Sequence, residues 1–298
     1  MQEGGYVIQS QHLSVNDGDG IRTILFLAGC PLRCKWCANP EGFTPKTKVG
    51  FFAENCTACK LCTTVCPQGI GININDERDR CTACGSCVSV CPNHAKKFLT
   101  EYKTVDELVE EVKRQIIFFR TSGGGVTFSG GECTMQADFL RALATRLDDL
   151  GIHLAMETSA YFDYDKVEDI LKRLSQLFVD IKHMDDEKHR YYTGVSNKKI
   201  LENIKRMAAL DIPTVVRIPT IIGVNADEEN IRATARFVHE NLPKAQIELL
   251  PYHTLGIYKY EALGMELPSE EFVAPTAEQL LELRSLVESC GVPTTETK

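Results

Sequence analysis

Two hydrophobic periods alternate along this chain, and together they predict its elements. Short apolar runs rich in β-branched residues, as in buried strands, alternate six times with stretches that have the apolar spacing of amphipathic helices. The predicted strands are 21–28, 125–128, 152–157, 176–182, 213–218 and 246–251. The predicted helices are 104–119, 135–150, 165–174, 197–210, 227–241 and 277–289.

This order of elements predicts the fold class. Six strand-helix units with almost wholly apolar strands indicate a parallel sheet covered by helices, because crossovers between parallel strands are right-handed. We therefore expect an α/β protein that forms a partial, TIM-like (β/α)6 barrel. The last helix also has end signals, since Thr276 and Gln279 have the spacing of a capping box and Gly291 follows where the helix should stop.

A cysteine-rich stretch interrupts the first unit between its strand and its helix. No helical period of useful length occurs in it, and Gly-Ile-Gly-Ile-Asn-Ile-Asn at 69–75 predicts a short hairpin. We expect an inserted domain over 50–98, within a main domain formed by residues 1–49 and 99–298. Because the insert leaves from a loop that follows a strand, it should lie at the mouth of the barrel, where such folds form their sites.

Eleven of the thirteen cysteines fall into three groups, two of which have four members. These two groups have the spacing C-x2-C-x2-C-x3-C-P of bacterial ferredoxins, in which the fourth cysteine ligates the other cluster of a pair. The spacing therefore predicts two closed [4Fe-4S] clusters. Their ligands are Cys56, Cys59, Cys62 and Cys66 in the first group, and Cys81, Cys84, Cys87 and Cys91 in the second.

The remaining group has three members, Cys30, Cys34 and Cys37. A four-iron cluster on three thiolates keeps one iron free for a ligand that is not protein, so we expect this group to be the reactive one. Disulfides are the first alternative, but they belong to short secreted chains, whereas this chain has 298 residues, an odd cysteine count and no apolar segment after Met1. Zinc is the second, although its sites rarely place four cysteines within a stretch this short.

Composition narrows the classes of partner. A formal charge of -8 argues against a nucleic-acid surface, which requires clustered Lys and Arg. No apolar run approaches the length of a membrane span, so we expect no membrane partner. Iron-sulfur clusters need a reducing compartment, which predicts a cytoplasmic protein whose partners are proteins or small molecules.

Polar residues at the ends of the predicted strands form a candidate site. Gly130 and Gly131 allow a ligand close to the backbone, and the carboxylate of Glu132 can accept from an ammonium group, although the motif alone could be a turn. Asp180 and Lys182 share one face of the fourth strand, and its apolar face must meet the helices. Both charges should point into the barrel unless the strand ends before them.

Three further residues extend this candidate site. Arg217 alternates with apolar neighbours in the fifth strand, so it should face inward and need an anion, either a ligand carboxylate or Asp180. His253 follows the sixth strand directly, and is otherwise an ordinary loop residue. Trp36, between two cysteines, offers an aromatic face to an adenine ring, or else packs in the core. Together these groups predict a ligand with an ammonium, a carboxylate and a ribose-adenine end.

The chain resembles the radical S-adenosylmethionine superfamily and, within it, the activating enzymes of glycyl radical enzymes, which include the pyruvate formate-lyase activase. The resemblance covers the whole length, the ferredoxin-like insert included. It rests on Asp-Gly-Asp-Gly-Ile-Arg-Thr at 17–23, the cysteine loop 29–37 with Asn-Pro-Glu at 39–41, Phe-Ser-Gly-Gly-Glu at 128–132, Asp-Ile-Lys at 180–182 and Leu-Pro-Tyr-His-Thr-Leu-Gly at 250–256.

The resemblance implies a cofactor set and a reaction. The cluster on the first three cysteines would bind the amino and carboxylate groups of S-adenosylmethionine, giving three [4Fe-4S] clusters in all. Reduction would cleave the sulfonium to methionine and a 5′-deoxyadenosyl radical, which takes hydrogen from a backbone glycine of a partner glycyl radical enzyme. A flavodoxin or ferredoxin would supply the electron. The residues implied to hold the cofactor are Gly130, Gly131 and Glu132 at its amino group, and Asp180, Lys182, Arg217 and His253 elsewhere.

Two departures from the family pattern concern the partner and a cation. Asp19 stands where the family usually has Pro, so contacts made by this turn, which includes Asp17, should depend on the partner. Glu157 and Thr158 correspond to a monovalent-cation site where the family prototype has Asp, which leaves cation binding open.

Two other functions remain as alternatives. A radical enzyme that modifies another peptide or a small molecule would use auxiliary clusters to bind its substrate, yet both four-cysteine groups lack an obvious open iron. A simple electron-transfer protein would not need a three-cysteine group or inward charges at one mouth. Production of methionine and 5′-deoxyadenosine separates the second alternative from both enzyme hypotheses.

Overall fold

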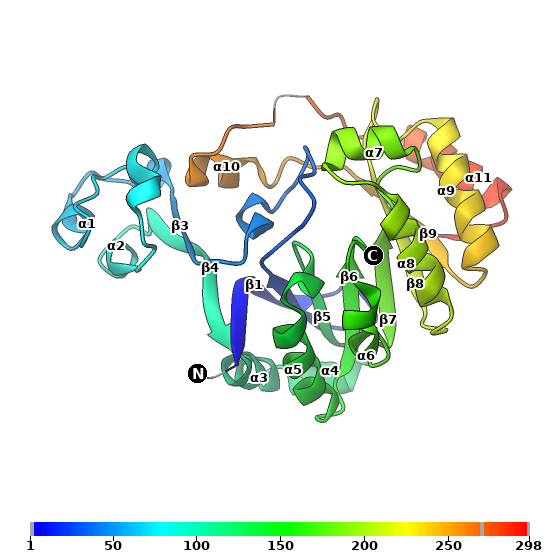
Figure 1. Ribbon diagram of the computed structural model, residues 1–298, viewed down its shortest axis with the longest axis horizontal. Coiled ribbons are helices and arrows are strands. Elements are labelled where there is room, and N and C mark those ends of the chain that lie inside the picture. The colour runs from blue at the N-terminus through cyan, green and yellow to red at the C-terminus, as the bar shows by residue number, and fades with distance from the viewer. Residues whose placement is uncertain (1–2, 269–270, 297–298) are drawn as a thin grey trace.

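The structure, a computed structural model, describes residues 3–268 and 271–296. It is a mixed α/β fold, and its described strands form one ten-stranded sheet in the order β10-β9-β8-β7-β6-β5-β2-β1-β4-β3 (Figure 1). No helix in these two ranges is long and apolar enough to cross a bilayer.

All six predicted strands are present, and they lie side by side in chain order and parallel to one another. Most of their residues are buried, as expected for a parallel sheet covered by helices. A short strand, β10 (Thr294–Thr295), extends the row beyond the sixth. The six are β2 (Arg22–Leu27), β5 (Gly125–Gly130), β6 (His153–Thr158), β7 (Gln176–Asp180), β8 (Thr214–Thr220) and β9 (Gln246–Pro251).

Helices follow the parallel strands and bury one face of the sheet. Val179 and Ile181 of the fourth unit and Val216 of the fifth belong to the main hydrophobic core, which leaves the alternate positions to the other face. The helices are α3 (Val105–Lys113), α4 (Ile116–Ser122), α5 (Ala137–Asp148), α6 (Glu168–Leu171), α7 (Asp186–Thr193), α8 (Lys198–Ala208), α9 (Glu228–Asn241), α10 (Ile257–Leu263) and α11 (Ala277–Ser289).

Helix ends agree with the sequence in some places and correct it in others. The capping box at Thr276 is present, and Gly291 follows the end of α11 with a positive φ of 81°. The helix predicted over 104–119 is wrong as one element, because the chain breaks between α3 and α4 at Arg114 and Gln115. Short helices α7 and α10, which periodicity did not predict, lie at the carboxyl ends of the strands.

Three antiparallel strands carry the sheet away from the parallel strands and into the cysteine-rich segment. β1 (Gly4–Ser14) pairs with β2 and β4 (Lys96–Thr104), and β4 pairs with β3 (Lys48–Phe51). The segment between β3 and β4 projects at one end of the molecule and holds two single-turn helices, α1 (Leu61–Thr64) and α2 (Ser86–Ser89) (Figure 1).

The predicted hairpin at 69–75 is wrong. This segment forms a loop that leads into a 3-10 helix, Ile74–Arg80, and contains no strand. Two of its alternating isoleucines are buried for another reason. Ile70 and Ile74 pack with Val49 in a small core that is separate from the main one.

Candidate active site

A cavity of about 330 Å³ opens where the parallel strands end. This volume lies in the usual range for a small-molecule site. The cavity brings together residues from strands far apart in the chain, because the ends of parallel strands meet at one edge of the sheet. Of the predicted site residues, its walls include Cys30, Cys34, Trp36, Cys37, Gly130, Gly131, Asp180, Lys182, Arg217 and His253.

The three-cysteine loop follows β2 and lies directly against the end of β5. A Cβ atom at Gly131 would lie 2.4 Å from the Gly29 carbonyl oxygen and 3.0 Å from the Cβ of Cys30, so only glycine allows this approach. Gly130 has φ of 121°, which other residues rarely adopt. Burial raises the pKa of the Cys30 and Cys37 thiols to about 12, so they stay protonated at neutral pH unless positive charge is brought to the loop.

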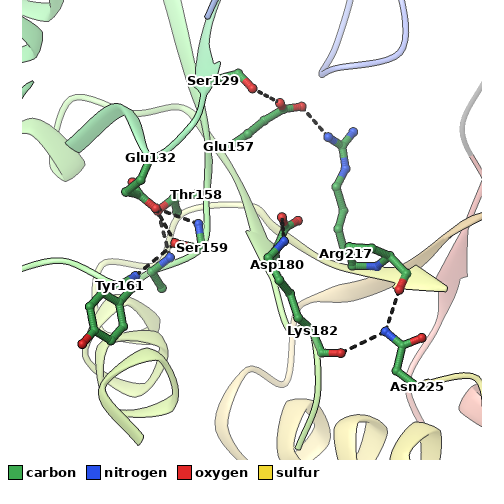
Figure 2. Close-up of polar contacts among 12 residues, drawn as sticks. Ser129, Glu132, Glu157, Thr158, Ser159, Tyr161, Asp180, Lys182, Arg217 and Asn225 are labelled. Atoms are coloured by element: carbon green, nitrogen blue, oxygen red, sulfur yellow. Dashed lines mark hydrogen bonds and ion pairs between the residues drawn. The ribbon is translucent and has the colours of Figure 1, made fainter. Parts of the chain in front are cut away.

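Asp180 and Lys182 both line the cavity, as the strand alternation predicts. Their side chains form an ion pair with Nζ 2.8 Å from Oδ2, and both are less than one-third exposed. Although burial opposes the charge of Lys182, the neighbouring Asp180 carboxylate raises the pKa of its ammonium above the ordinary value. The Asn225 amide donates to the Lys182 carbonyl at 2.9 Å and fixes the end of the strand (Figure 2).

Arg217 also faces inward, but its protein ion-pair partner is not Asp180. Its guanidinium pairs with Glu157, and with Glu248 at 2.6 Å, while Asp17 lies 3.7 Å away. It also lies 4.1 Å from the centroid of the Phe178 ring. The guanidinium of Arg217 is therefore paired with carboxylates of the protein itself.

Glu157 is central to this acidic group. It accepts hydrogen bonds from Ser129 and Arg217 (Figure 2). Burial raises the pKa of Glu157 to about 7, although Arg217 acts against the shift. Glu248, which the sequence analysis missed, lies opposite Arg217 in the β8–β9 ladder, and its alternation with apolar neighbours was a signal for an inward position.

Glu132, unlike the two glycines before it, does not line the cavity. The residue is wholly buried. Its oxygens accept from the Thr158 hydroxyl at 2.9 Å, and from the backbone N–H and hydroxyl of Ser159 at 2.9 and 2.6 Å (Figure 2). They also accept from the Thr134 hydroxyl at 2.8 Å. These bonds tie the end of β5 to the end of β6, and they also occupy Thr158.

Aromatic and imidazole groups complete the rim. Trp36 lines the cavity and also packs against the rings of Tyr192 and Phe272, with centroids 5.7 and 5.8 Å away. Its stacking against an adenine ring therefore stays a prediction. His253 is exposed and borders the cavity where β9 ends.

Helix α10 holds the three-cysteine loop from behind, a role that the sequence did not signal. Lys259 donates to Asn39 at 2.8 Å and to the buried carboxylate of Glu41 at 2.6 Å. The next residue, Tyr260, donates its hydroxyl to the Cys37 carbonyl at 3.0 Å. The loop is thus fixed by two consecutive side chains of one helix.

The same helix contacts the cysteine-rich segment. The Asn75 amide donates to the Glu261 carbonyl at 3.0 Å, and Arg78 donates to the Ala262 carbonyl at 3.1 Å. In Figure 1, α10 lies between this segment and the rest of the molecule. It therefore links the two cysteine-bearing parts of the chain mechanically.

Two further cavities occur in the cysteine-rich segment, and each is lined by cysteines of both four-member groups. No carboxylate lines either of them among the described residues. The fourth cysteine of each group thus meets the first three of the other, as in the crossed ferredoxin pattern, with Cys62 reaching both cavities. One is lined by Cys62, Cys66, Cys81, Cys84 and Cys87, the other by Cys56, Cys59, Cys62 and Cys91.

The donor chemistry of all three groups suits iron-sulfur clusters. All thirteen cysteines are free thiols, which removes the disulfide alternative. Within residues 3–268 and 271–296, no three His, Cys, Asp or Glu side chains are grouped so that they could hold a single metal ion.

Comparison with known proteins agrees with this geometry. Residues 24–237 match the radical SAM superfamily. The chain is 38% identical over 295 residues to the trans-4-hydroxy-L-proline dehydratase activating enzyme of Clostridioides difficile, with 97% of each chain covered. It is 40% identical over 282 residues to the isethionate sulfite-lyase activating enzyme of Oleidesulfovibrio alaskensis, with 90% of each covered.

A solved structure supports the same assignment. A domain of a pyruvate-formate lyase-activating enzyme from Bacteroides vulgatus is 33% identical, with a TM-score of 0.50, and the match covers 59% of this chain and 99% of that one. The chain therefore belongs to the radical SAM superfamily and, within it, to the activating enzymes of glycyl radical enzymes. It is an enzyme, which confirms the family and the class of activity that the motifs predicted.

Proposed function

We propose that the enzyme reductively cleaves S-adenosylmethionine and uses the 5′-deoxyadenosyl radical to take hydrogen from a backbone glycine of its partner. One observation carries the proposal: three free thiols, a glycine backbone and an Asp-Lys ion pair border a single cavity. A [4Fe-4S] cluster on Cys30, Cys34 and Cys37 supplies the electron when it is reduced. The residues around it bind and orient the cofactor.

The end of β5 receives the amino group of the cofactor in this proposal. The backbone at Gly130 and Gly131 is accessible from the cavity and close to Cys30. Glu132 acts through position, because its carboxylate is saturated by donors from β6 and from its own turn. It holds the glycines at the distance that the cysteine loop requires.

The remaining residues orient the rest of the cofactor. The Asp180–Lys182 ion pair offers an acceptor and a donor to the cofactor's polar groups. Trp36 and His253 border the cavity where the adenine and ribose would lie. Arg217 contributes mainly by holding Glu157 in place, since its guanidinium is already paired.

We extend the proposal to the fold and the insert. Residues 1–49 and 99–298 form a partial (β/α)6 barrel whose open side admits the glycine loop of the partner. Residues 50–98 form a ferredoxin-like insert with two auxiliary [4Fe-4S] clusters, an assignment supported by the crossed cysteine sets of the two cavities. Three such clusters and their chemistry suit a cytoplasmic enzyme.

The insert relays electrons to the reactive cluster from a flavodoxin or ferredoxin. Replacing Cys66 and Cys81 by Ala removes two thiols from one cavity, and therefore from one cluster. Cleavage driven by the protein donor should slow far more than cleavage driven by dithionite. Equal slowing of both, with the reactive cluster intact, would contradict the relay and favour a role in docking or folding.

The test of the main proposal uses the reconstituted, anaerobic enzyme. It should bind about twelve irons and convert S-adenosylmethionine with dithionite into equal amounts of methionine and 5′-deoxyadenosine. A glycyl radical should then appear by EPR on the partner glycyl radical enzyme. Formation of both products without a protein radical would favour a radical enzyme that acts on a small molecule or another peptide. If neither methionine nor 5′-deoxyadenosine is formed, the electron-transfer alternative is favoured.

A further inference from the structure

Lys96 is a buried lysine without a protein counter-ion. It is the first residue of β4 and is only 2% exposed, whereas the next residue, Lys97, is exposed. Its backbone pairs with Phe51 of β3, and its ammonium lies 5.1 Å from the centroid of the Phe51 ring. Among the described residues no carboxylate forms an ion pair with it.

Such a position is costly for a charged group. A buried ammonium loses its hydration, and lysines are therefore almost never fully buried unless an anion compensates the charge. The contact with one aromatic ring replaces only part of that loss. The burial of Lys96 thus points to an anion that is not a side chain of this chain.

The surroundings of Lys96 indicate where that anion lies. Lys96 lines both cysteine-lined cavities of the segment between β3 and β4. Cys62 is the one cysteine that shares this position among the described residues. Within the described part of the chain, the only other charged residue on either wall is Lys60, which is exposed and borders one cavity alone.

We propose that Lys96 is the shared counter-ion of the two auxiliary [4Fe-4S] clusters and raises the reduction potential of both. The proposal rests on the auxiliary clusters of the proposed function. A four-iron cluster on four thiolates is anionic, and reduction adds one more negative charge. A nearby cation therefore stabilises the reduced form more than the oxidised form, and burial limits screening by water and salt.

The test compares three full-length reconstituted variants with the native enzyme. Lys96→Met removes the charge at nearly constant length, Lys96→Arg keeps it, and Lys97→Met removes the charge of the exposed neighbour on the same strand. Midpoint potentials are measured by anaerobic redox titration with EPR detection. The auxiliary signals are those that added S-adenosylmethionine leaves unchanged.

Lys96→Met should lower the ratio of reduced to oxidised cluster at least tenfold at a fixed potential, for both auxiliary clusters. For a one-electron couple this corresponds to a shift of about 59 mV to more negative potential. Lys96→Arg and Lys97→Met should stay close to the native values. If Lys96→Met cannot retain the auxiliary clusters while Lys96→Arg does, the charge is needed even for assembly, which also supports the proposal.

Several results would overturn it. Native potentials in Lys96→Met would do so, as would equal shifts in Lys96→Met and Lys97→Met. Loss of both clusters in Lys96→Arg as well as in Lys96→Met would show that packing, not charge, matters. The iron content of the native enzyme is measured first: about four irons would refute the auxiliary clusters themselves, and so distinguishes failure of the proposed function from failure of the role of Lys96.

Discussion

Replacing Arg217 by Met tests the charge balance beneath the cavity. The side chain of Arg217 is 7% exposed and that of its partner Glu248 is 4% exposed, so replacing the cation by Met breaks a buried ion pair from one side. Breaking a buried ion pair from one side costs about 3 to 5 kcal/mol. At about 2 to 4 °C per kcal/mol, the expected loss in the midpoint of thermal unfolding is roughly 6 to 20 °C.

The loss should depend on pH with a definite sign. Burial raises the pKa of Glu157 from its ordinary value of 4.5 to about 7, so the folded state holds this proton more tightly than the unfolded state. Stability from such a group falls as pH rises from about 4.5 to 7. Because Arg217 opposes this shift, its removal should raise the pKa of Glu157 further and extend the loss of stability to higher pH. The stability of the variant relative to the native enzyme should therefore be lower at pH 8 than at pH 5.5.

The assay is anaerobic thermal unfolding of the reconstituted enzyme at both pH values. Arg146→Met is the matched control, because Arg146 pairs with Asp106 at the surface, where both side chains are at least half exposed. Such a pair contributes about 0 to 1 kcal/mol. The reasoning is refuted if Arg217→Met unfolds within a few degrees of the control at pH 8, or if its defect is larger at pH 5.5.

Three further predictions concern the site. Replacing Cys30, Cys34 and Cys37 together by Ala should lower the iron content from about twelve to about eight and abolish cleavage of S-adenosylmethionine, with the auxiliary EPR signals unchanged. Glu132→Gln places an amide donor against the backbone N–H and hydroxyl of Ser159, which should cost about 1 to 3 kcal/mol of stability and weaken cofactor binding in equilibrium dialysis. Lys259→Met leaves Glu41 buried and unpaired, so chelators should remove the loop's iron faster than from Lys259→Arg.

The regular part of the fold could be predicted because its signals are local. Residues 246–251 and 277–289 form a strand and a helix with the predicted bounds. Alternation along β7 and β8 also predicted which side chains reach the cavity, since a strand directs every second residue to the same face. The three cysteine groups could be identified for the same reason, because their spacing lies within short segments.

The parts that could not be predicted depend on contacts between distant segments. The partners of Arg217 come from β6 and β9, so no local pattern could select Glu157 over Asp180. β1 has few apolar residues, and antiparallel pairing stabilises it from both sides. Lys259 lies on a short helix whose importance becomes visible only from its contacts with Asn39 and Glu41.

The β3–β4 ladder has a consequence for how this chain could gain or lose its auxiliary part. Phe51 and Lys96 are direct ladder partners, and the Phe52 N–H donates to the Ala95 carbonyl at 2.8 Å. The chain thus leaves the ladder after Phe51 and re-enters it at the paired residue Lys96, so residues 52–95 begin and end side by side. A two-residue hairpin turn would close the gap without moving any strand of the parallel sheet. Excision would remove the contacts with α10 and the packing of Ile70 and Ile74 against Val49. A single local deletion could therefore give a shorter enzyme that keeps the parallel sheet and lacks the auxiliary part.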